Sequence, residues 1–347
     1  MPTALIIGGR GQSGLAIAQR LRDDGWQVVG TASGPPPDPA VVPGIRWVLR
    51  TGGDLASTLD EAGAGPVDAA VHTTAFTAAD AEALMGLGDR IGSAVVLSTL
   101  SVYTDASGRS LDTADTPDRF PEWPVPIPED QPLLSPAGQT YSHQKVAVEE
   151  ALRQRAPWPV TIVRPGAIHG RYSRHLREWY FIKRALDGRP AVVLPFGGRS
   201  VFQPTATTNM AELVRLAAAR PGDRALNAAD LDPPSAADIS AAVEELMRWR
   251  PQHVLVVGPE PAPTVGNHPW AVPRPVVADM RRARDDLGYE QPVSYREALE
   301  DTVRWAVDAA RGRDWKDVFP TLGRYPDLFD YAAEDAYLAG GAGGQQR

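Results

Sequence analysis

Tyr141 and Lys145 stand four positions apart in the pattern Tyr141-x-x-x-Lys145. On a helix this spacing brings both side chains to one face. A phenol titrates at about 10 in water, and a neighbouring ammonium favours the phenolate and lowers that pKa. Tyr141 would then exchange a proton with a substrate hydroxyl or carbonyl, while Lys145 reaches a ribose hydroxyl. Thr99, directly after the apolar run 94–98, is placed to hydrogen-bond the same reacting oxygen.

Three glycines, Gly8, Gly11 and Gly14, follow the apolar residues 4–7 and lead into a stretch of helical periodicity. A strand, a glycine turn and a helix N-terminus form a site for a diphosphate, because backbone N–H groups and the helix dipole face the anion. The same turn also fits the register Gly9-x-Gly11-x-x-Gly14 of ordinary dehydrogenases. Both registers predict a dinucleotide cofactor.

Short apolar runs alternate with helical segments through the first half of the chain. The runs lie at 4–7, 27–31, 45–49, 67–73, 94–98 and 160–164, and the helices at 14–23, 55–62, 78–90 and 138–154. This alternation predicts an α/β fold of the Rossmann type, with a doubly wound parallel sheet. After residue 165 the pattern loosens, with helices at 175–187, 209–219, 235–249 and 294–311 and a strand at 191–194.

We therefore expect three parts. An NAD(P)-binding Rossmann domain over 1–165 would carry the Thr/Tyr/Lys site, and a smaller, mixed α/β substrate domain over 166–311 would be interleaved with it. Residues 312–347 would form an aromatic extension and a flexible, glycine-rich tail.

The composition excludes several classes of protein. The chain has 347 residues, a net charge of −8 and no cysteine, which excludes disulfides and thiolate metal sites. No His-Glu-x-x-His pattern occurs, so we expect no metal. The acidic balance disfavours nucleic acid as a partner. No apolar run is long enough for a membrane span, and no signal peptide is evident, so we expect a cytoplasmic protein that acts on a small molecule.

With these motifs, the sequence resembles the extended short-chain dehydrogenase/reductase family of NAD(P)-dependent epimerases, dehydratases and reductases. The resemblance covers roughly residues 3–308. It rests on Gly8-x-x-Gly11-x-x-Gly14, Asp54-Leu55, residues 71–75, Ser98-Thr99-x-x-Val102-Tyr103, Tyr141-x-x-x-Lys145, Arg164-Pro165-Gly166, and residues 282–289 and 303–305.

The resemblance implies a role for each matching position. Tyr141 is the general acid/base, Lys145 lowers its pKa and holds the nicotinamide ribose, and Thr99 rather than Ser101 orients the reacting oxygen. The remaining cofactor contacts are expected from Gly8, Gly11 and Gly14 at the diphosphate, Asp54 and Leu55 at the adenine, Thr73, Thr74 and Ala75 along the cofactor, and Pro165 and Gly166 at the nicotinamide carboxamide.

The end of the run 27–31 bears on the choice of cofactor. Ala32 stands where NAD-binding members carry an acidic residue that bonds the adenosine ribose. An acidic side chain there would repel a 2′-phosphate, so its loss permits NADP. Arg10, inside the glycine turn, is placed to pair with that phosphate. We expect NADP(H), with NAD(H) as the alternative because no second basic residue follows the run.

The substrate side departs from the family. Leu100 and Ser101 replace the Asp-Glu pair of similar sugar dehydratases, which disfavours a 4,6-dehydratase. The segment between Ala75 and Val95 is short where relatives carry a long helix of the usual dimer interface, so we expect a monomer or an atypical homodimer. The candidates to grip a phosphate or carboxylate of the substrate are Arg171, Arg174 and Arg199.

Three functions follow from these observations. The leading one is an NADP(H)-dependent oxidoreductase that moves a hydride to or from a carbonyl or alcohol of a sugar-like or small metabolite. The alternative is a sugar or nucleotide-sugar epimerase that keeps NAD(P) tightly bound and passes through a keto intermediate. A second alternative is a non-catalytic, NADP-sensing regulator, although a pure binder needs no proton relay.

The proline-rich loop 104–139 is either a cover over the site or a rigid surface excursion.

Overall fold

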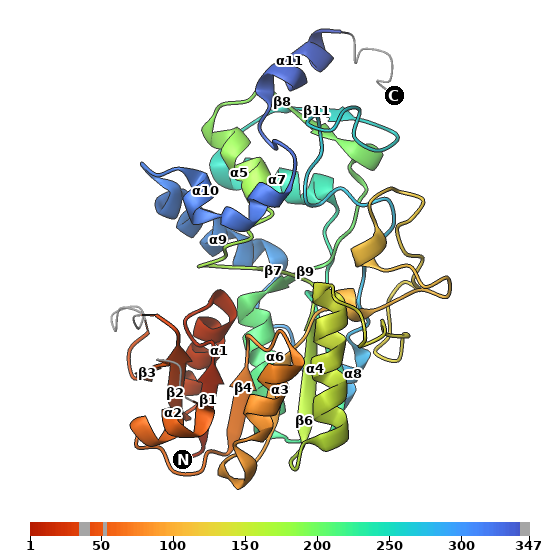
Figure 1. The fold of residues 1–347 in the computed structure, drawn as a ribbon. Helices are drawn as coiled ribbons and strands as arrows, with labels where there is room; N and C mark the ends of the chain where they lie inside the picture. The colour runs from red at the N-terminus through yellow and green to blue at the C-terminus, as the bar shows by residue number, and fades with distance from the viewer. Residues whose placement is uncertain (35–41, 51–53, 341–347) are drawn as a thin grey trace.

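The main sheet of the protein is parallel (Figure 1). The computed structural model describes residues 1–34, 42–50 and 54–340. The strands of the sheet are β1 (Thr3–Ile7), β2 (Gln27–Ala32), β3 (Arg46–Leu49), β4 (Ala69–His72), β5 (Ala94–Leu97), β6 (Val160–Pro165) and β10 (Arg224–Ala228). Their order is β10-β6-β5-β4-β1-β2-β3, and every neighbouring pair is parallel. The chain winds outward from β1 in both directions, which confirms the predicted Rossmann-type fold.

Two apolar cores lie on opposite faces of this sheet, because successive residues of a strand point to opposite sides. Ala4 and Ile6 of β1 belong to one core, with α1 (Gln12–Asp23), α6 (Thr207–Ala219) and α8 (Arg281–Leu287). Leu5 and Ile7 belong to the other, with α2 (Leu55–Glu61), α3 (Ala78–Met85) and α4 (Tyr141–Arg155). All four side chains are fully buried, so the helices enclose the sheet on both faces.

The protein has two lobes, and the first lobe is the seven-stranded sheet with the helices that cover it. The chain after β6 contributes to both lobes. β7 (Ala167–His169) pairs in parallel with β9 (Pro204–Ala206). The second lobe is built from α5 (Trp179–Leu186), β8 (Ala191–Leu194), α7 (Ala236–Met247), β11 (Gln252–Leu255) and α9 (Tyr295–Ala310). Between these segments the chain returns to the first lobe, where α6 packs against α1 and β10 pairs with β6. The lobes are therefore interleaved in sequence.

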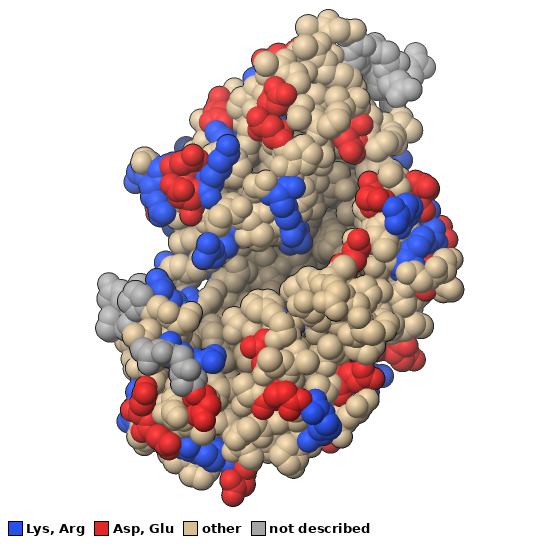
Figure 2. All heavy atoms as spheres, viewed as in Figure 1, with Lys and Arg blue, Asp and Glu red and all other residues tan. Residues whose placement is uncertain are grey.

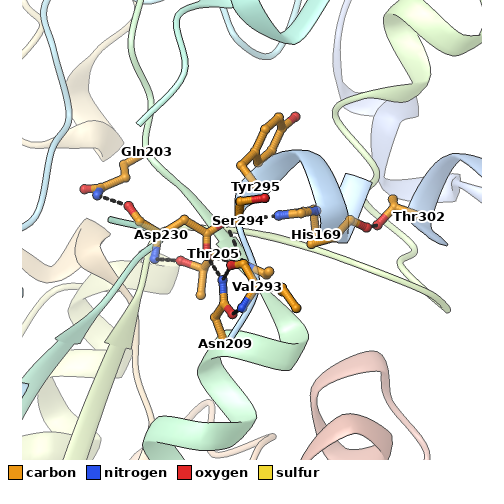
Figure 3. Close-up of polar contacts among 12 residues, drawn as sticks. His169, Gln203, Thr205, Asn209, Asp230, Val293, Ser294, Tyr295 and Thr302 are labelled. Atoms are coloured by element: carbon orange, nitrogen blue, oxygen red, sulfur yellow. Dashed lines mark hydrogen bonds and ion pairs between the residues drawn. The ribbon is translucent and has the colours of Figure 1, made fainter. Parts of the chain in front are cut away.

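A buried polar network joins the crossing segments (Figure 3). Asp230 is fully buried and accepts hydrogen bonds from Ala206 N at 3.0 Å and Asn209 Nδ2 at 2.7 Å. Its second oxygen lies 3.3 Å from His169 Nε2. Burial works against the charge on His169, yet the bond to Asp230 raises the pKa of His169 above its ordinary value. Asn209 also donates to Val293 O at 2.9 Å, so the network fixes the second lobe on the first.

The start of α4 differs from the predicted start at 138. Thr140 is the N-cap, and its side chain accepts from His143 N. A capping side chain satisfies a backbone donor that would otherwise be unpaired, so the helix begins directly after it. Tyr141 is therefore the first helical residue and Lys145 lies one turn further on, as the spacing predicts.

The aromatic extension is folded against the second lobe, with α10 (Trp315–Val318) and α11 (Tyr331–Ala339). Phe319 is fully buried, and its ring centroid lies 4.7 Å from that of Trp179. Arg184 and Glu334 form a buried ion pair at 2.8 Å. The tail predicted to be flexible, residues 341–347, lies outside the described residues. Of the helices that the structure describes, none has the length and apolar character that a bilayer crossing requires.

Candidate active site

The glycine turn between β1 and α1 leaves no room for a side chain at Gly8 or at Gly14. Gly8 has φ +81°, and a Cβ there would lie 2.5 Å from Thr73 Oγ1. A Cβ at Gly14 would lie 2.6 Å from the Cα of Gly9 and closer still to the carbonyl oxygen of Gly8. Helix α1 therefore packs directly on the turn, and its N-terminus points into the open space above the strands. This is the geometry that receives a diphosphate.

The end of β4 locks onto the same turn. Thr73 donates from its N to Ile7 O at 2.9 Å, and from Oγ1 to Ile7 O at 3.0 Å. Thr74 packs against the Cα of Gly8, and Ala75 is buried. Asp54 caps α2, because its carboxylate accepts from Ser57 N at 2.7 Å, and this bond lowers its pKa. Leu55 is buried behind it. The cofactor contacts expected from these positions remain predictions.

Two basic residues stand at the end of β2, where we expect the adenosine ribose. The guanidinium of Arg10 lies against Gly34, just after β2, where an added Cβ would meet its Nη1. Ala32, the last residue of β2, has no charge to oppose it. Arg50 follows β3 and donates from its backbone N to Ala32 O at 2.8 Å. The sequence analysis missed Arg50, although its position after the run 45–49 places it beside the end of β2 in a parallel sheet.

Lys145 is held by two backbone carbonyls at the ends of neighbouring strands. Its Nζ donates to Ala75 O at 2.7 Å and to Leu97 O at 2.9 Å, and the residue is 2 % exposed. Burial lowers the pKa of Lys145 to about 8. An ammonium has three protons, so one is left for a further acceptor. The site thus fixes the position of the ammonium before any ligand binds.

Tyr141 is half exposed at the N-terminus of α4, and Lys145 Nζ is 5.8 Å from the ring centroid of Tyr141. Burial of the phenol and the charge of Asp112 raise the pKa of Tyr141, while a hydrogen bond to Thr99 lowers it. The net direction is upward, opposite to the expected effect of Lys145. The physical reason is that desolvation of the phenol is the largest cause and the charge of Lys145 does not offset it.

A chain of hydroxyl groups leads from Thr99 to a carboxylate. Thr99 Oγ1 and Ser101 Oγ are 3.0 Å apart, Ser101 Oγ and Ser142 Oγ are 3.0 Å apart, and Ser142 Oγ is 2.7 Å from Asp112 Oδ1. Each hydroxyl has one proton, and a carboxylate only accepts. Ser142 Oγ is placed to donate to Asp112 or to Ser101, and Thr99 and Ser101 share one hydrogen bond between their hydroxyls. The chain of hydroxyls therefore links Thr99 to a carboxylate at the edge of the site.

Asp112 and Ser142, two members of this chain of hydroxyl and carboxylate groups, were not expected from the sequence. Ser142 stands inside the Tyr-x-x-x-Lys pattern, but Asp112 comes from the proline-rich loop, which gives no local signal of its role. The structure places that loop along the site, with Leu111, Asp112 and Phe120 among the lining residues. Of its two interpretations, the loop is a wall of the site rather than a surface excursion.

Thr99, Ser101, Asp112 and Tyr141 line one cleft of about 800 Å³ between the lobes. Gln12 and Ser13 line it at the N-terminus of α1, Thr99 and Tyr141 at its floor, and Pro165 and Gly166 beside them. Figure 2 shows this hollow, with basic side chains on the wall above it. Among the described residues, no three His, Asp or Glu side chains gather as metal ligands would.

The three candidate substrate arginines lie elsewhere. Arg171 lines a separate pocket of about 360 Å³ beside α1 and α9. Arg199 lines another, of about 280 Å³. Arg174 is exposed and is not part of the cleft wall. The arginines that line the cleft are Arg177 and Arg324, which the sequence analysis did not single out.

The sheet order, the glycine turn and the Tyr141–Lys145 pair together define a protein of the short-chain dehydrogenase/reductase class. The sequence model of the NAD dependent epimerase/dehydratase family matches residues 4–229, more than half of the 347 residues. The chain belongs to this family.

Solved structures agree on the fold. A UDP-glucose 4-epimerase is 18 % identical over 90 % of this chain and 99 % of its own, with a TM-score of 0.66. MoeE5, in complex with UDP-glucuronic acid and NAD, is 20 % identical over 88 % and 99 %, with a TM-score of 0.65. The dTDP-glucose 4,6-dehydratase of Bacillus anthracis, in complex with NAD, is 15 % identical over 92 % and 100 %, at 0.63. No curated protein matches the sequence.

Proposed function

We propose that the protein is an NAD(P)-dependent epimerase of a sugar substrate, in particular of a nucleotide sugar. The observation that carries the proposal is that Thr99 and Tyr141 line the floor of one cleft that begins at the N-terminus of α1, with Lys145 Nζ 5.8 Å from the ring centroid of Tyr141. Family membership supports an epimerase over the simple reductase that we first expected. The MoeE5 complex, with a nucleotide sugar and NAD in the same fold, gives further support.

The residues of the first lobe fit a dinucleotide cofactor. At Gly8 and Gly14 a Cβ would collide with the surrounding turn, so the backbone stands open to a diphosphate. Lys145 has one N–H left to donate beyond its two carbonyl acceptors, and this donor suits a ribose hydroxyl. When bound, NAD(P) would accept a hydride from the substrate carbon and return it.

Proton transfer falls to the residues of α4 and of the segment after β5. Tyr141 takes the proton of the substrate hydroxyl as the carbon is oxidised, and Thr99 holds the same oxygen. Lys145 keeps a positive charge beside the phenol, and this charge gains importance once a cofactor and a substrate exclude water from the cleft. After the keto sugar turns in the cleft, Tyr141 returns the proton and the opposite epimer forms.

We further propose that NADP(H) is preferred over NAD(H). Arg10 and Arg50 flank the uncharged end of β2, where a 2′-phosphate would extend from the adenosine ribose. Calorimetric titration of both cofactors tests this proposal. We expect Arg10→Gln to weaken NADP+ binding by roughly tenfold and to leave NAD+ binding nearly unchanged. Equal affinity of the wild-type protein for both cofactors would contradict the preference.

The function itself is tested with UDP-glucose, UDP-N-acetylglucosamine and UDP-glucuronic acid as substrates. We expect NMR to show a new epimer at catalytic amounts of cofactor, with no net change in absorbance of reduced cofactor. Reduced cofactor consumed in proportion to product would instead establish a reductase. Tight cofactor binding without turnover on a broader panel of sugars and ketones would favour the non-catalytic regulator.

A further inference from the structure

We propose that the aromatic extension completes the substrate cleft and provides, together with the segment before α5, a subsite for an anionic group of the substrate, either a phosphate or a carboxylate. The inference rests on the proposed function, since it takes the cleft as the substrate site. Its four residues, His175, Arg177, Arg324 and Tyr325, all line the cleft.

Arg177 is a part-buried cation whose charged neighbours are Glu178 and Arg324 and whose guanidinium bonds to Tyr325, and no carboxylate of the described residues lies within ion-pair distance of it. Its guanidinium carbon lies 5.3 Å from the ring centroid of Phe202 and 5.9 Å from that of Trp270. On the next helix, Lys183 and Arg184 each pair with a carboxylate, whereas Arg177 pairs with none in the described part of the chain. Burial lowers the pKa of Arg177, but a guanidinium stays charged in proteins. An unpaired charge against two aromatic rings is stabilised when an anion enters.

Arg324 brings a second charge to the same wall. Its Nη2 donates to His175 Nε2 at 3.0 Å and to Tyr325 Oη at 3.3 Å. Burial, together with Arg177 and Arg324, lowers the pKa of His175 to about 3, so the imidazole is neutral and accepts this bond. A neutral acceptor orients Arg324 without cancelling its charge. The wall therefore presents two positive charges that no carboxylate of the described residues pairs.

The extension holds Arg324 and Tyr325 as parts of a folded wall. Thr321 N donates to Arg174 O at 3.3 Å, and Leu328 O accepts from Arg184 Nη2 at 3.0 Å. Leu322, between these two bonds, is buried. Positions fixed before binding reduce the entropy lost when a ligand is ordered. The extension therefore fixes the position of the Arg324 charge. Its role goes beyond the packing of its aromatic residues.

Three acidic residues also line the cleft, and they leave the balance positive at this wall. Asp112 is engaged by Ser142 at the catalytic end, and Asp115 pairs with Arg119 at 2.6 Å. Glu260 is the third. It adds one negative charge to a lining that holds the two positive charges of Arg177 and Arg324. An oxyanion of tetrahedral or planar shape suits such a pair, because a guanidinium donates two parallel hydrogen bonds to it.

The test is a calorimetric titration of the full chain saturated with NAD+, so that the glycine turn is filled. UDP is compared with uridine to detect a phosphate site, and glucuronate with glucose to detect a carboxylate site. We expect an anionic probe to bind better than its neutral partner, and Arg177→Gln or Arg324→Gln to weaken it by roughly tenfold or more. Arg174→Gln, a nearby exposed arginine outside the cleft, should stay within about twofold.

Two results would overturn the proposal: anionic and neutral probes that bind the wild type equally, or cleft variants that bind as tightly as Arg174→Gln. Arg177→Lys, which keeps the charge, serves if Arg177→Gln fails to fold, and the exposed Arg324 can be replaced without that risk. Tyr141→Phe separates this proposal from the proposed function, because it should retain anion binding while losing turnover. Binding that persists when no epimer forms in the wild type would sink only the proposed function.

Discussion

The two walls of the cleft are built in different ways. On the first-lobe side the supporting contacts are mainly with backbone: Gly8 and Gly14 open the turn, and the carbonyls of Ala75 and Leu97 hold Lys145. The opposite wall is made of side chains from distant segments, such as His175 and Arg324, which are 149 positions apart. Backbone geometry admits few substitutions, so the cofactor wall is constrained. Side chains on separate segments change one at a time, so we expect the opposite wall to set the choice of substrate.

The largest effect should come from Tyr141, where the two walls meet the substrate. Tyr141→Phe removes the proton donor and keeps the ring, so we expect turnover to fall roughly 10³-fold with substrate affinity almost unchanged. Steady-state kinetics and calorimetry measure the two quantities. Tyr331→Phe is the matched control, because Tyr331 begins α11 and does not line the cleft, and it should keep the wild-type rate. A Tyr141→Phe enzyme near the wild-type rate would remove Tyr141 from the mechanism.

Lys145 should make the stability of the protein depend on pH. Its pKa is depressed from 10.5 to about 8, so the unfolded chain binds more protons between these values. The free energy of unfolding therefore rises with pH across this window. Below the window, the contribution of Lys145 does not change with pH. We expect the free energy of unfolding of the wild type, relative to Lys145→Met, to increase by at most about 3 kcal/mol from pH 8 to pH 10.5. Urea unfolding at several pH values checks this, and a flat difference would contradict the depressed pKa.

A glycine pair tests whether the cofactor wall is limited by backbone contact. Gly14→Ala places a methyl group against Gly9 and the Gly8 carbonyl, so we expect a loss of about 1–3 kcal/mol in stability and weaker cofactor binding. Gly11→Ala is the control, because its Cβ would lie 3.6 Å from Gly8 O, an ordinary contact. Thermal unfolding and titration should separate the two variants. Equal losses would mean that contact at the turn is not the limiting factor.

Asp112 gives the smallest expected effect and tests the hydroxyl chain. Asp112→Asn removes a charge that raises the pKa of Tyr141, so we expect the pH optimum of turnover to move toward lower pH by less than about one unit. The rate at the optimum should fall by roughly a few-fold, because an amide oxygen still accepts from Ser142 but, unlike a carboxylate, takes up no proton. Asp115→Asn also lines the cleft but lies outside the chain, and its pH profile should match the wild type.

The sequence predicted the parts of the site that depend on local pattern. The Gly8-x-x-Gly11-x-x-Gly14 turn and the strand–helix alternation each lie within a few consecutive residues, and the sheet order confirms the fold that they indicate. The structure brings Thr99 and Tyr141 to one cleft, as the motifs require. Their chemical roles stay predictions.

The opposite wall was not predictable because its members are distant in sequence. Basic density around Arg171, Arg174 and Arg177 was visible, but a run of arginines does not show which one faces the cleft. That choice depends on how the chain leaves β7 and on the rings of Phe202 and Trp270, which arrive from later segments. Arg324 and Asp112 come from an extension and a loop whose folding no local periodicity describes.

The ion pair between Arg184 and Glu334 limits how far this chain can be shortened. Both side chains are 1 % exposed, and Glu334 also takes a bond from Arg189 at 3.1 Å. A chain ending at 311, where the last long helix closes, would leave Arg184 buried without its counter-ion and strip Phe319 from Trp179. A buried charge that loses its partner is strongly destabilising. We therefore expect a chain that ends at 311 to be much less stable than one that keeps α11, although the family model matches only residues 4–229.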